Sequence, residues 1–98
     1  MWRHGDVFIA RVDVIPKQAF PRGDGILAHG EVTGHSHRLE KPSAAELWEL
    51  GEQLFLRVVA PSVRVVHEEH KPIILPRGTY RVWQQREYSP EAIRRVLD

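Results

Sequence analysis

Alternation between apolar and polar positions dominates the chain and predicts β-strands. From 7 to 15, the apolar Phe8, Val12 and Val14 alternate with the polar Arg11 and Asp13, and this period of two is typical of a strand with one buried face. Prolines and glycines bound the further extended segments, which are 26–39, 53–60, 63–66, 73–75 and 79–88. Glycines within the first of these suggest bends or bulges. The pattern therefore predicts five or six strands.

Two segments carry helix signals instead. Ser43 is followed three residues later by Glu46, a capping-box pattern that predicts a short helix ending at Leu50, just before a glycine. From Ser89 onward, a capping serine, a proline at the first helical position and an apolar stripe predict a helix that reaches the C-terminus. The chain is therefore expected to end in a helix after its last strand.

The connections between the predicted strands are short, and strands joined in this way pair antiparallel. We expect a mainly β protein, a small antiparallel barrel or sandwich, because closure hides the strand edges. It would carry the short internal helix and the C-terminal helix. Because the chain has 98 residues and no internal repeat, we expect one domain spanning 1–98.

Composition narrows the function classes. The chain has 14 Lys and Arg residues against 13 Asp and Glu residues, a net charge of +1, which argues against a strongly basic nucleic-acid coat. It has no cysteine, so disulfides, thiolate nucleophiles and cysteine-type zinc sites are excluded. No apolar stretch is long enough for a transmembrane helix, and the first residues lack the apolar region of a secretory signal. We therefore expect a cytoplasmic protein without membrane association.

A histidine pair at 35 and 37 is the first candidate site. Residues two apart on a strand share a face, so His35 and His37 would project side by side, roughly 6–7 Å apart. That spacing lets two imidazoles reach one metal ion. The same face would carry His29, Glu31 and Thr33. It would either line a polar pocket or lie in solvent on an edge strand that has no function.

A second histidine pair lies in the segment His67-Glu68-Glu69-His70. On a regular strand His67 and His70 face opposite ways, so only one of them joins the first pair unless the chain turns between them. His67 is favoured because it continues the preceding apolar strand. A solvated polar turn is the alternative. The chain is short, it has two histidine pairs, and it has no cysteine to compete as a ligand. On these grounds a shared histidine site and a solvated turn are about equally favoured.

The first histidine segment resembles a motif of the cupins, which are small β-barrels of the jelly-roll type. Gly30, His35, His37 and Glu40 match the residue types of the first cupin motif. Two of their spacings are each one residue shorter than in that family. The segment Pro76-Arg77-Gly78 resembles the start of the second cupin motif.

The resemblance implies a barrel lumen that holds a divalent metal ion. The ligands would be the first histidine pair and a carboxylate, either Glu31 or Glu40. Arg81 stands where the family places its second-motif histidine, so a histidine of the second pair would replace that ligand. Cupins include enzymes and binding proteins, and the resemblance therefore leaves open whether the protein is an enzyme. The C-terminal third is also similar to small bacterial proteins without an assigned function.

A second candidate surface combines Arg81, Arg86 and Tyr88 with Trp83. Arginines and aromatic rings together are typical of surfaces that bind phosphates or stack nucleobases. The alternative is an exposed face with local salt bridges.

Three functions follow from these candidates. The first is a cupin-like protein whose histidines hold a divalent metal ion or a small ligand, with or without catalysis. The second is a non-catalytic accessory module that docks onto a protein or RNA partner, with a homodimer as a further alternative. The third is a metal-independent ribonuclease that uses histidines as acid and base. The sequence specifies neither the metal nor a substrate.

Overall fold

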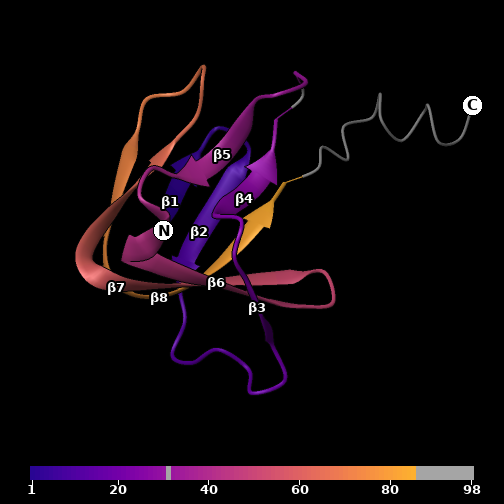
Figure 1. The fold of residues 1–98 in the computed structure, drawn as a ribbon, viewed down its shortest axis with the longest axis vertical. Helices are drawn as coiled ribbons and strands as arrows, with labels where there is room; N and C mark the ends of the chain where they lie inside the picture. Colours follow the sequence, from indigo (N-terminus) through magenta and orange to yellow (C-terminus); the bar gives the residue numbers. More distant parts are fainter. Residues whose placement is uncertain (31, 86–98) are drawn as a thin grey trace, which may run out of the picture.

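The computed structural model of the chain describes residues 1–30 and 32–85. Within this part, eight strands form one antiparallel sheet (Figure 1). The strands are β1 (Trp2–His4), β2 (Val7–Arg11), β3 (Phe20–Arg22), β4 (Ile26–His29), β5 (Ser36–Leu39), β6 (Ala45–Leu50), β7 (Gln53–Val66) and β8 (Ile73–Gln84). A 3-10 turn, η1 (Pro42–Ala44), precedes β6, and the described residues contain no α-helix.

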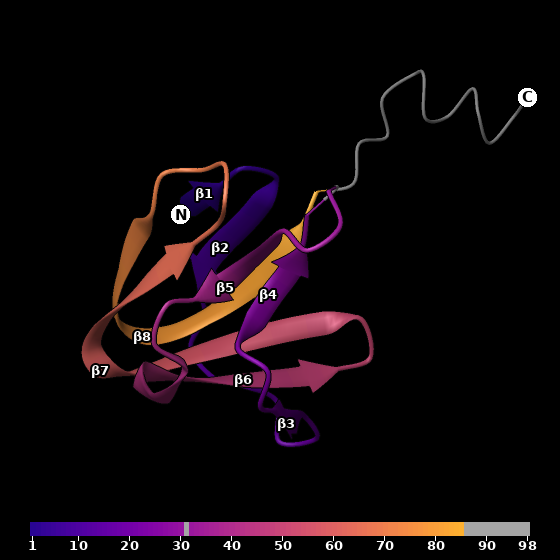
Figure 2. The same cartoon turned by 45° about the horizontal axis from the view of Figure 1, so that its top comes forward.

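The two long strands β7 and β8 organise the sheet. The strand order is β1-β2-β8-β7-β5-β4, and β6 pairs with both β7 and β3. β7 pairs with β6 along its first half and with β5 near its end, while the second half of β8 pairs with β2. Both long strands curve strongly, so they connect the two ends of the sheet around a bend (Figures 1 and 2).

The bend lies where β7 and β8 shift register. Their pairing is interrupted between Val58 and Ser62 of β7, a stretch that contains Pro61, which has no amide hydrogen for the ladder. An irregularity of this kind bends a strand and increases its twist. As a result the β4–β5 hairpin reaches the β1–β2 hairpin, and the ring of His37 in β5 hydrogen-bonds to that of His4 in β1.

The main hydrophobic core lies between the two parts of the bent sheet. Alternate residues point into it, and Ile9, Leu56 and Tyr80 are fully buried there. The ring of Tyr80 meets Trp2 edge to face, with centroids 5.4 Å apart. Phe55, next to Leu56 in β7, has the opposite parity and belongs to a smaller cluster on the other face. The predicted period of two is present in β2, but the predicted face is wrong: the buried side chains are Val7 and Ile9, while Phe8 is only partly buried and Val14 is exposed.

The prediction of a mainly β, antiparallel protein is confirmed, but the prediction of a barrel or sandwich is wrong. The strands form a single sheet that is not closed, because β1 and β4 end the path without pairing to each other. The segments 53–60 and 63–66 are one strand, and so are 73–75 and 79–84. The prolines between them mark bends within long strands rather than strand ends, which the sequence pattern does not distinguish.

The predicted helix from Ser43 to Leu50 is mostly a strand. The 3-10 turn lacks a side-chain capping bond, and β6 pairs with β7 along its whole length. Leu47 is buried in the core while its neighbour Glu46 is exposed. Pairing on both sides of β6 therefore outweighs the local capping signal, as tertiary context often does. The predicted C-terminal helix, which begins at Ser89, lies outside the described residues.

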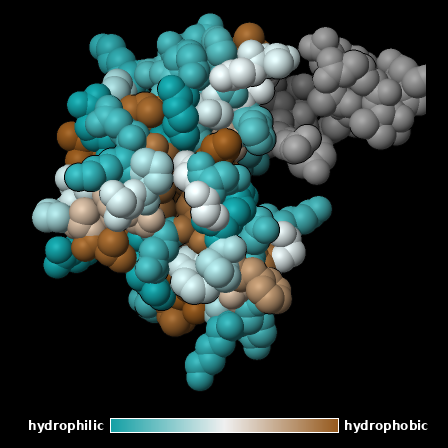
Figure 3. Space-filling view, in the orientation of Figure 1, coloured by the Kyte–Doolittle hydropathy of each residue, from teal (hydrophilic) through white to brown (hydrophobic). Residues whose placement is uncertain are grey.

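Polar side chains cover most of the face seen in Figure 3, where apolar side chains form only small, separate areas. The most exposed large apolar residues include Val14, Phe20 and Ile74, which come from distant parts of the chain. Scattered residues of this kind are normal on a protein surface. None of the described residues forms a helix with the length and hydrophobicity needed to cross a membrane.

Candidate metal centre

Five histidines come together where the two hairpins meet the turn between β7 and β8. Within this group, neighbouring ring centroids lie 4.4 to 6.4 Å apart. We call the group the histidine cluster, and its members are His4, His35, His37, His67 and His70. The remaining histidine, His29, is exposed at the end of β4.

Two glycines let the backbone approach the histidine cluster closely. Gly5 has a φ of +63° in the two-residue turn between β1 and β2. A Cβ at this position would lie 2.7 Å from Nε2 of His70 and 3.1 Å from Cε1 of His37. A Cβ on Gly30 would lie 2.9 Å from Nε2 of His67. The rings therefore pack directly against main chain that only glycine can supply without a shift.

A hydrogen-bond chain fixes the two buried histidines, His4 and His37. Nε2 of His4 lies 2.9 Å from the carbonyl oxygen of Lys71, and because a carbonyl only accepts, this nitrogen carries the proton. In the neutral ring the lone pair is then on Nδ1, which lies 2.9 Å from Nδ1 of His37. His37 must donate this bond, so its own lone pair is on Nε2.

Burial keeps both rings neutral. His4 is exposed by 2% and His37 by 1%. Desolvation, followed by repulsion from His67 and His4, lowers the pKa of His37 to about 4. Desolvation also lowers the pKa of His4, and its bond to the Lys71 carbonyl opposes that shift. Both rings thus remain in the neutral form that binds metal ions.

The Asp6 carboxylate faces the free nitrogen of His37. Its Oδ1 lies 3.3 Å from Nε2 of His37, and the Asp6 side chain is 43% exposed. The side-chain amide of Gln84 in β8 donates to the other oxygen, Oδ2, at 2.7 Å. The carboxylate is therefore held with one oxygen bonded and the other turned towards the ring.

Charged side chains tie the turn after β7 to β5. Glu68 accepts hydrogen bonds from the amide of Ser36 at 3.1 Å and from the guanidinium of Arg38 at 2.8 Å. Bonds from its own amide and from that of Ser36 lower the pKa of Glu68 to about 2. Glu69 lies 3.2 Å from Nδ1 of His35, which donates to the carboxylate and keeps its lone pair on Nε2. The turn is thus held in place beside the buried histidines.

His67 is the member of the cluster whose hydrogen bond opposes metal binding. Its Nδ1 accepts a bond from the amide of Glu69 at 2.9 Å, so the neutral ring carries its proton on Nε2. To bind a metal ion, the ring must either offer Nδ1 or move its proton there. In both cases the Glu69 amide loses its acceptor.

Two sets of three side chains have ligand atoms that all lie within 4.8 Å of one another. One set is His37, His67 and His70, and the other is His35, His67 and Glu68. The carboxylate of Glu68 is already bonded to the amide of Ser36 and to Arg38. The first set is the better candidate, because its ligands are all imidazoles and His37 already has its lone pair on the free nitrogen.

The structure brings the two predicted histidine pairs together. The chain turns after β7, so His67 and His70 both lie in the cluster with His35 and His37. The expected common face from 29 to 37 is not formed, because the chain reverses between β4 and β5. His35 consequently precedes β5 and lies partly exposed, while His37 is buried within the strand.

Other predicted site residues lie elsewhere. Glu40 is exposed, and its Oε2 lies 3.5 Å from Nε of Arg64 rather than in the cluster. The exposed Arg81 places its guanidinium 5.6 Å from the ring centroid of Trp83. Three further candidates lie outside the described residues: Glu31, Arg86 and Tyr88.

Sequence reasoning missed His4 and Asp6. The signal was present in His4-Gly5-Asp6, because a glycine followed by a polar residue between two extended segments is typical of a tight hairpin. A hairpin at this point places His4 and Asp6 beside each other at the end of two paired strands. The contacts of these residues are with segments more than 30 positions away, which no local pattern reveals.

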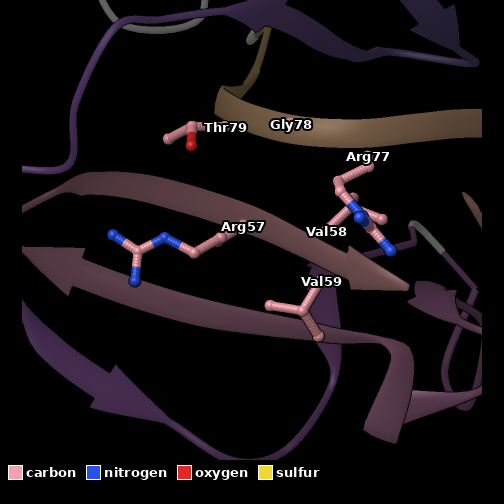
Figure 4. A pocket seen from close by; sticks show the side chains of 6 residues that line it. All are labelled: Arg57, Val58, Val59, Arg77, Gly78 and Thr79. Atoms are coloured by element: carbon pink, nitrogen blue, oxygen red, sulfur yellow. The ribbon is translucent and has the colours of Figure 1, made fainter. Parts of the chain in front are cut away.

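A shallow hollow of about 400 Å³ lies at the bend, lined by Arg57, Val58, Val59, Arg77, Gly78 and Thr79 (Figure 4). Its two arginines already have partners. Arg57 lies 3.3 Å from Glu46, and Arg77 donates to the carbonyl of Ala60 at 3.4 Å. The lining contains neither a histidine nor a carboxylate, so the hollow offers no metal ligands.

The comparisons with known proteins identify a family without an assigned activity. Residues 3–85 match the family described as a domain of unknown function, DUF8820. No curated protein and no solved structure matches the chain. Neither the matched family nor the open sheet supports the resemblance to cupins. The match spans the described strands almost completely and includes the whole histidine cluster.

Proposed function

The chain belongs to the family of the domain of unknown function DUF8820, and from this premise we propose that it binds one divalent transition-metal ion through His37, His67 and His70. The observation that carries this proposal is the convergence of these three ligand atoms to within 4.8 Å of one another. Such convergence joins β5 to a turn some 30 residues later, so it is not a by-product of local sequence.

The chemistry of the ligands favours a particular class of metal. Imidazole nitrogens suit Zn²⁺, Co²⁺, Ni²⁺ and Cu²⁺, whereas Mg²⁺ and Ca²⁺ prefer oxygen ligands. The chain of bonds from His37 through His4 to the Lys71 carbonyl is the kind of outer-shell support that orients metal-binding histidines. His70 is exposed and makes no hydrogen bond among the described residues, which leaves its ring free to turn towards an ion.

Metal binding sets the distances between the three ligand atoms. Neighbouring ligands in a tetrahedral zinc site are about 3.3 Å apart, as follows from bond lengths of about 2.0–2.1 Å. The separations, each at most 4.8 Å, therefore have to shrink by no more than roughly 1.5 Å. Because His37 is buried and His70 is exposed, we expect His70 to make most of this movement.

Metal titration of protein without a histidine tag tests the proposal. After removal of metals with a chelator, we expect one Zn²⁺, Co²⁺ or Ni²⁺ ion to bind per chain by calorimetry, and Mg²⁺ not to bind. Replacing His37, His67 and His70 together by Gln should lower the affinity at least about 100-fold, since even outer-shell partners are typically worth 10–100-fold.

The matched control is His29→Gln, which removes the exposed histidine outside the cluster. This variant should bind as the wild type does. The proposal is wrong if the untagged wild type takes up no transition metal, or if the His29 variant loses as much affinity as the triple variant.

Metal binding should also break the hydrogen bond from the Glu69 amide to His67. Because a neutral imidazole has one lone pair, His67 cannot serve the ion and this amide together. On addition of Zn²⁺ we expect faster hydrogen exchange at the Glu69 amide, measured by NMR. The Ser36 amide, which donates to Glu68, should keep its protection. Unchanged exchange at Glu69 in the zinc-loaded protein would show that His67 is not a ligand.

A further inference from the structure

The separation of the Asp6 carboxylate from the His37 ring matches that of two ligands on one metal ion. Oδ1 of Asp6 lies 3.3 Å from Nε2 of His37. Neighbouring ligand atoms in a tetrahedral site are also about 3.3 Å apart. Asp6 and His37 therefore already have the spacing of coordinated ligands. Asp6 belongs to neither set of three whose ligand atoms lie within 4.8 Å of one another, so His67 and His70 have to move towards it when the ion binds.

The two facing atoms are both electron donors. The hydrogen-bond chain from the Lys71 carbonyl through His4 leaves the lone pair of His37 on Nε2. The Oδ1 atom of an ionised Asp6 carries lone pairs only. Two such atoms repel each other at this distance unless a proton or a cation lies between them, so the arrangement favours a cation at this point.

Asp6 is also held in the orientation that a ligand needs. The Gln84 side chain donates to its Oδ2 at 2.7 Å, and the amide of Gln85 donates to its main-chain carbonyl at 2.8 Å. Hydrogen bonds to the second oxygen of a carboxylate are a common outer-shell feature of metal sites. Both bonds come from the end of β8, which fixes the β1–β2 turn relative to the sheet.

We propose that Asp6 is the fourth ligand, so that a Zn²⁺-class ion is held in a closed site of three histidines and one aspartate. The inference rests on the proposed function and adds to it the coordination number. Sites with four protein ligands have no position for a water molecule, whereas catalytic zinc sites keep one open. The ion is then a cross-link between the β1–β2 turn, β5 and the turn after β7, and not a centre that activates water.

Cobalt substitution of the full chain distinguishes a closed site from an open one. Four-coordinate tetrahedral Co²⁺ absorbs visible light much more strongly than five- or six-coordinate Co²⁺, and an open position takes up added azide, which changes the spectrum. We expect the wild type to give an intense spectrum that azide does not alter. In Asp6→Asn, the Co²⁺ affinity should fall by at least about 10-fold, and azide should change the spectrum.

The matched control is Asp13→Asn, which removes an exposed carboxylate beyond the end of β2 and should leave affinity and spectrum unchanged. If Asp6→Asn keeps the wild-type affinity and the azide-insensitive spectrum, Asp6 is not a ligand, and the three-histidine site stands without it. If the wild type binds no Co²⁺, the proposed function fails together with this inference. Thermal melting in chelator checks that both variants remain folded.

Discussion

Lowering the pH of the metal-free protein from 7 to 4 should reduce its free energy of unfolding by up to about 3 kcal/mol through His37 alone. The pKa of this buried ring is about 4 in the folded protein instead of 6.5. Between these two values the unfolded chain takes up a proton that the folded chain does not. The stabilisation that comes from the neutral His37 ring is therefore fully present above pH 6.5 and is lost as the pH falls towards 4. The pKa of His4 is also lowered, so this ring adds to the loss of stability at low pH.

Urea unfolding in the presence of a chelator, at pH 7, 6, 5 and 4, measures this effect. The comparison variant is His37→Gln, whose side-chain amide does not titrate and can donate to His4 as the imidazole does. Its stability should depend much less on pH between 6.5 and 4. Equal pH profiles for the wild type and this variant would contradict the role given to His37.

Glu68 makes the free energy of unfolding depend on pH in a second, more acidic range. Its pKa is about 2 in the folded protein instead of 4.5, so its contribution is present above pH 4.5 and is lost as the pH falls towards 2. The Glu68→Gln variant should therefore be less stable than the wild type above about pH 4.5, and this difference should shrink as the pH falls towards 2, measured by urea unfolding across this pH range. Stability lost between pH 6.5 and 4 therefore reports mainly on the buried rings, and stability lost between pH 4.5 and 2 reports on the turn after β7.

The strands could be predicted from the sequence where apolar and polar residues alternate along a single strand. The period of two correctly indicates the strands that begin at Val7, Gln53 and Ile73, because each has one face against the core. It fails for β6, where Ser43 and Glu46 carry a helix signal that cross-strand pairing overrides. It also fails at the bend, because a proline within a long curved strand and a proline at a strand end have the same local signature.

The site was predictable only in part, for a related reason. The two histidine pairs could be recognised from spacing, and the absence of cysteine left imidazoles as the strongest remaining metal ligands. Their convergence depends on pairing between strands that are far apart in sequence. His4 and Asp6 entered the site through the β1–β2 hairpin, whose histidine and aspartate have no unusual spacing relative to the other candidates.

A metal ion bound by the histidine cluster, as proposed, would stabilise the folded protein and protect it against acid. Desolvation and the neighbouring histidines lower the pKa of His37, so acid destabilises the metal-free protein. An ion that binds only the folded protein stabilises it by mass action. Saturating Zn²⁺ should therefore reduce the acid sensitivity of the wild type at pH 6 and leave His37→Gln almost unaffected, which a thermal melt at that pH can measure.

Gly5→Ala should weaken metal binding by at least about 10-fold, an effect comparable to the loss of an outer-shell partner. The new Cβ would lie 2.7 Å from Nε2 of His70 and 3.1 Å from Cε1 of His37. His37 is held by buried hydrogen bonds, so His70 has to move away from the ion. A positive φ also costs a non-glycine residue about 1–2 kcal/mol, which lowers the stability of the metal-free protein.

Gly51→Ala separates these two effects. Gly51 has a φ of +59° in the turn between β6 and β7, close to the +63° of Gly5, but a Cβ there meets nothing within 4 Å. Both variants should lose stability in chelator, measured by urea unfolding, because they share the backbone cost, and Gly5→Ala should lose at least as much as Gly51→Ala because its Cβ also meets the two rings. Only Gly5→Ala should lose affinity for Zn²⁺ by calorimetry. If the two variants bind Zn²⁺ equally well, the turn between β1 and β2 does not form a wall of the metal centre.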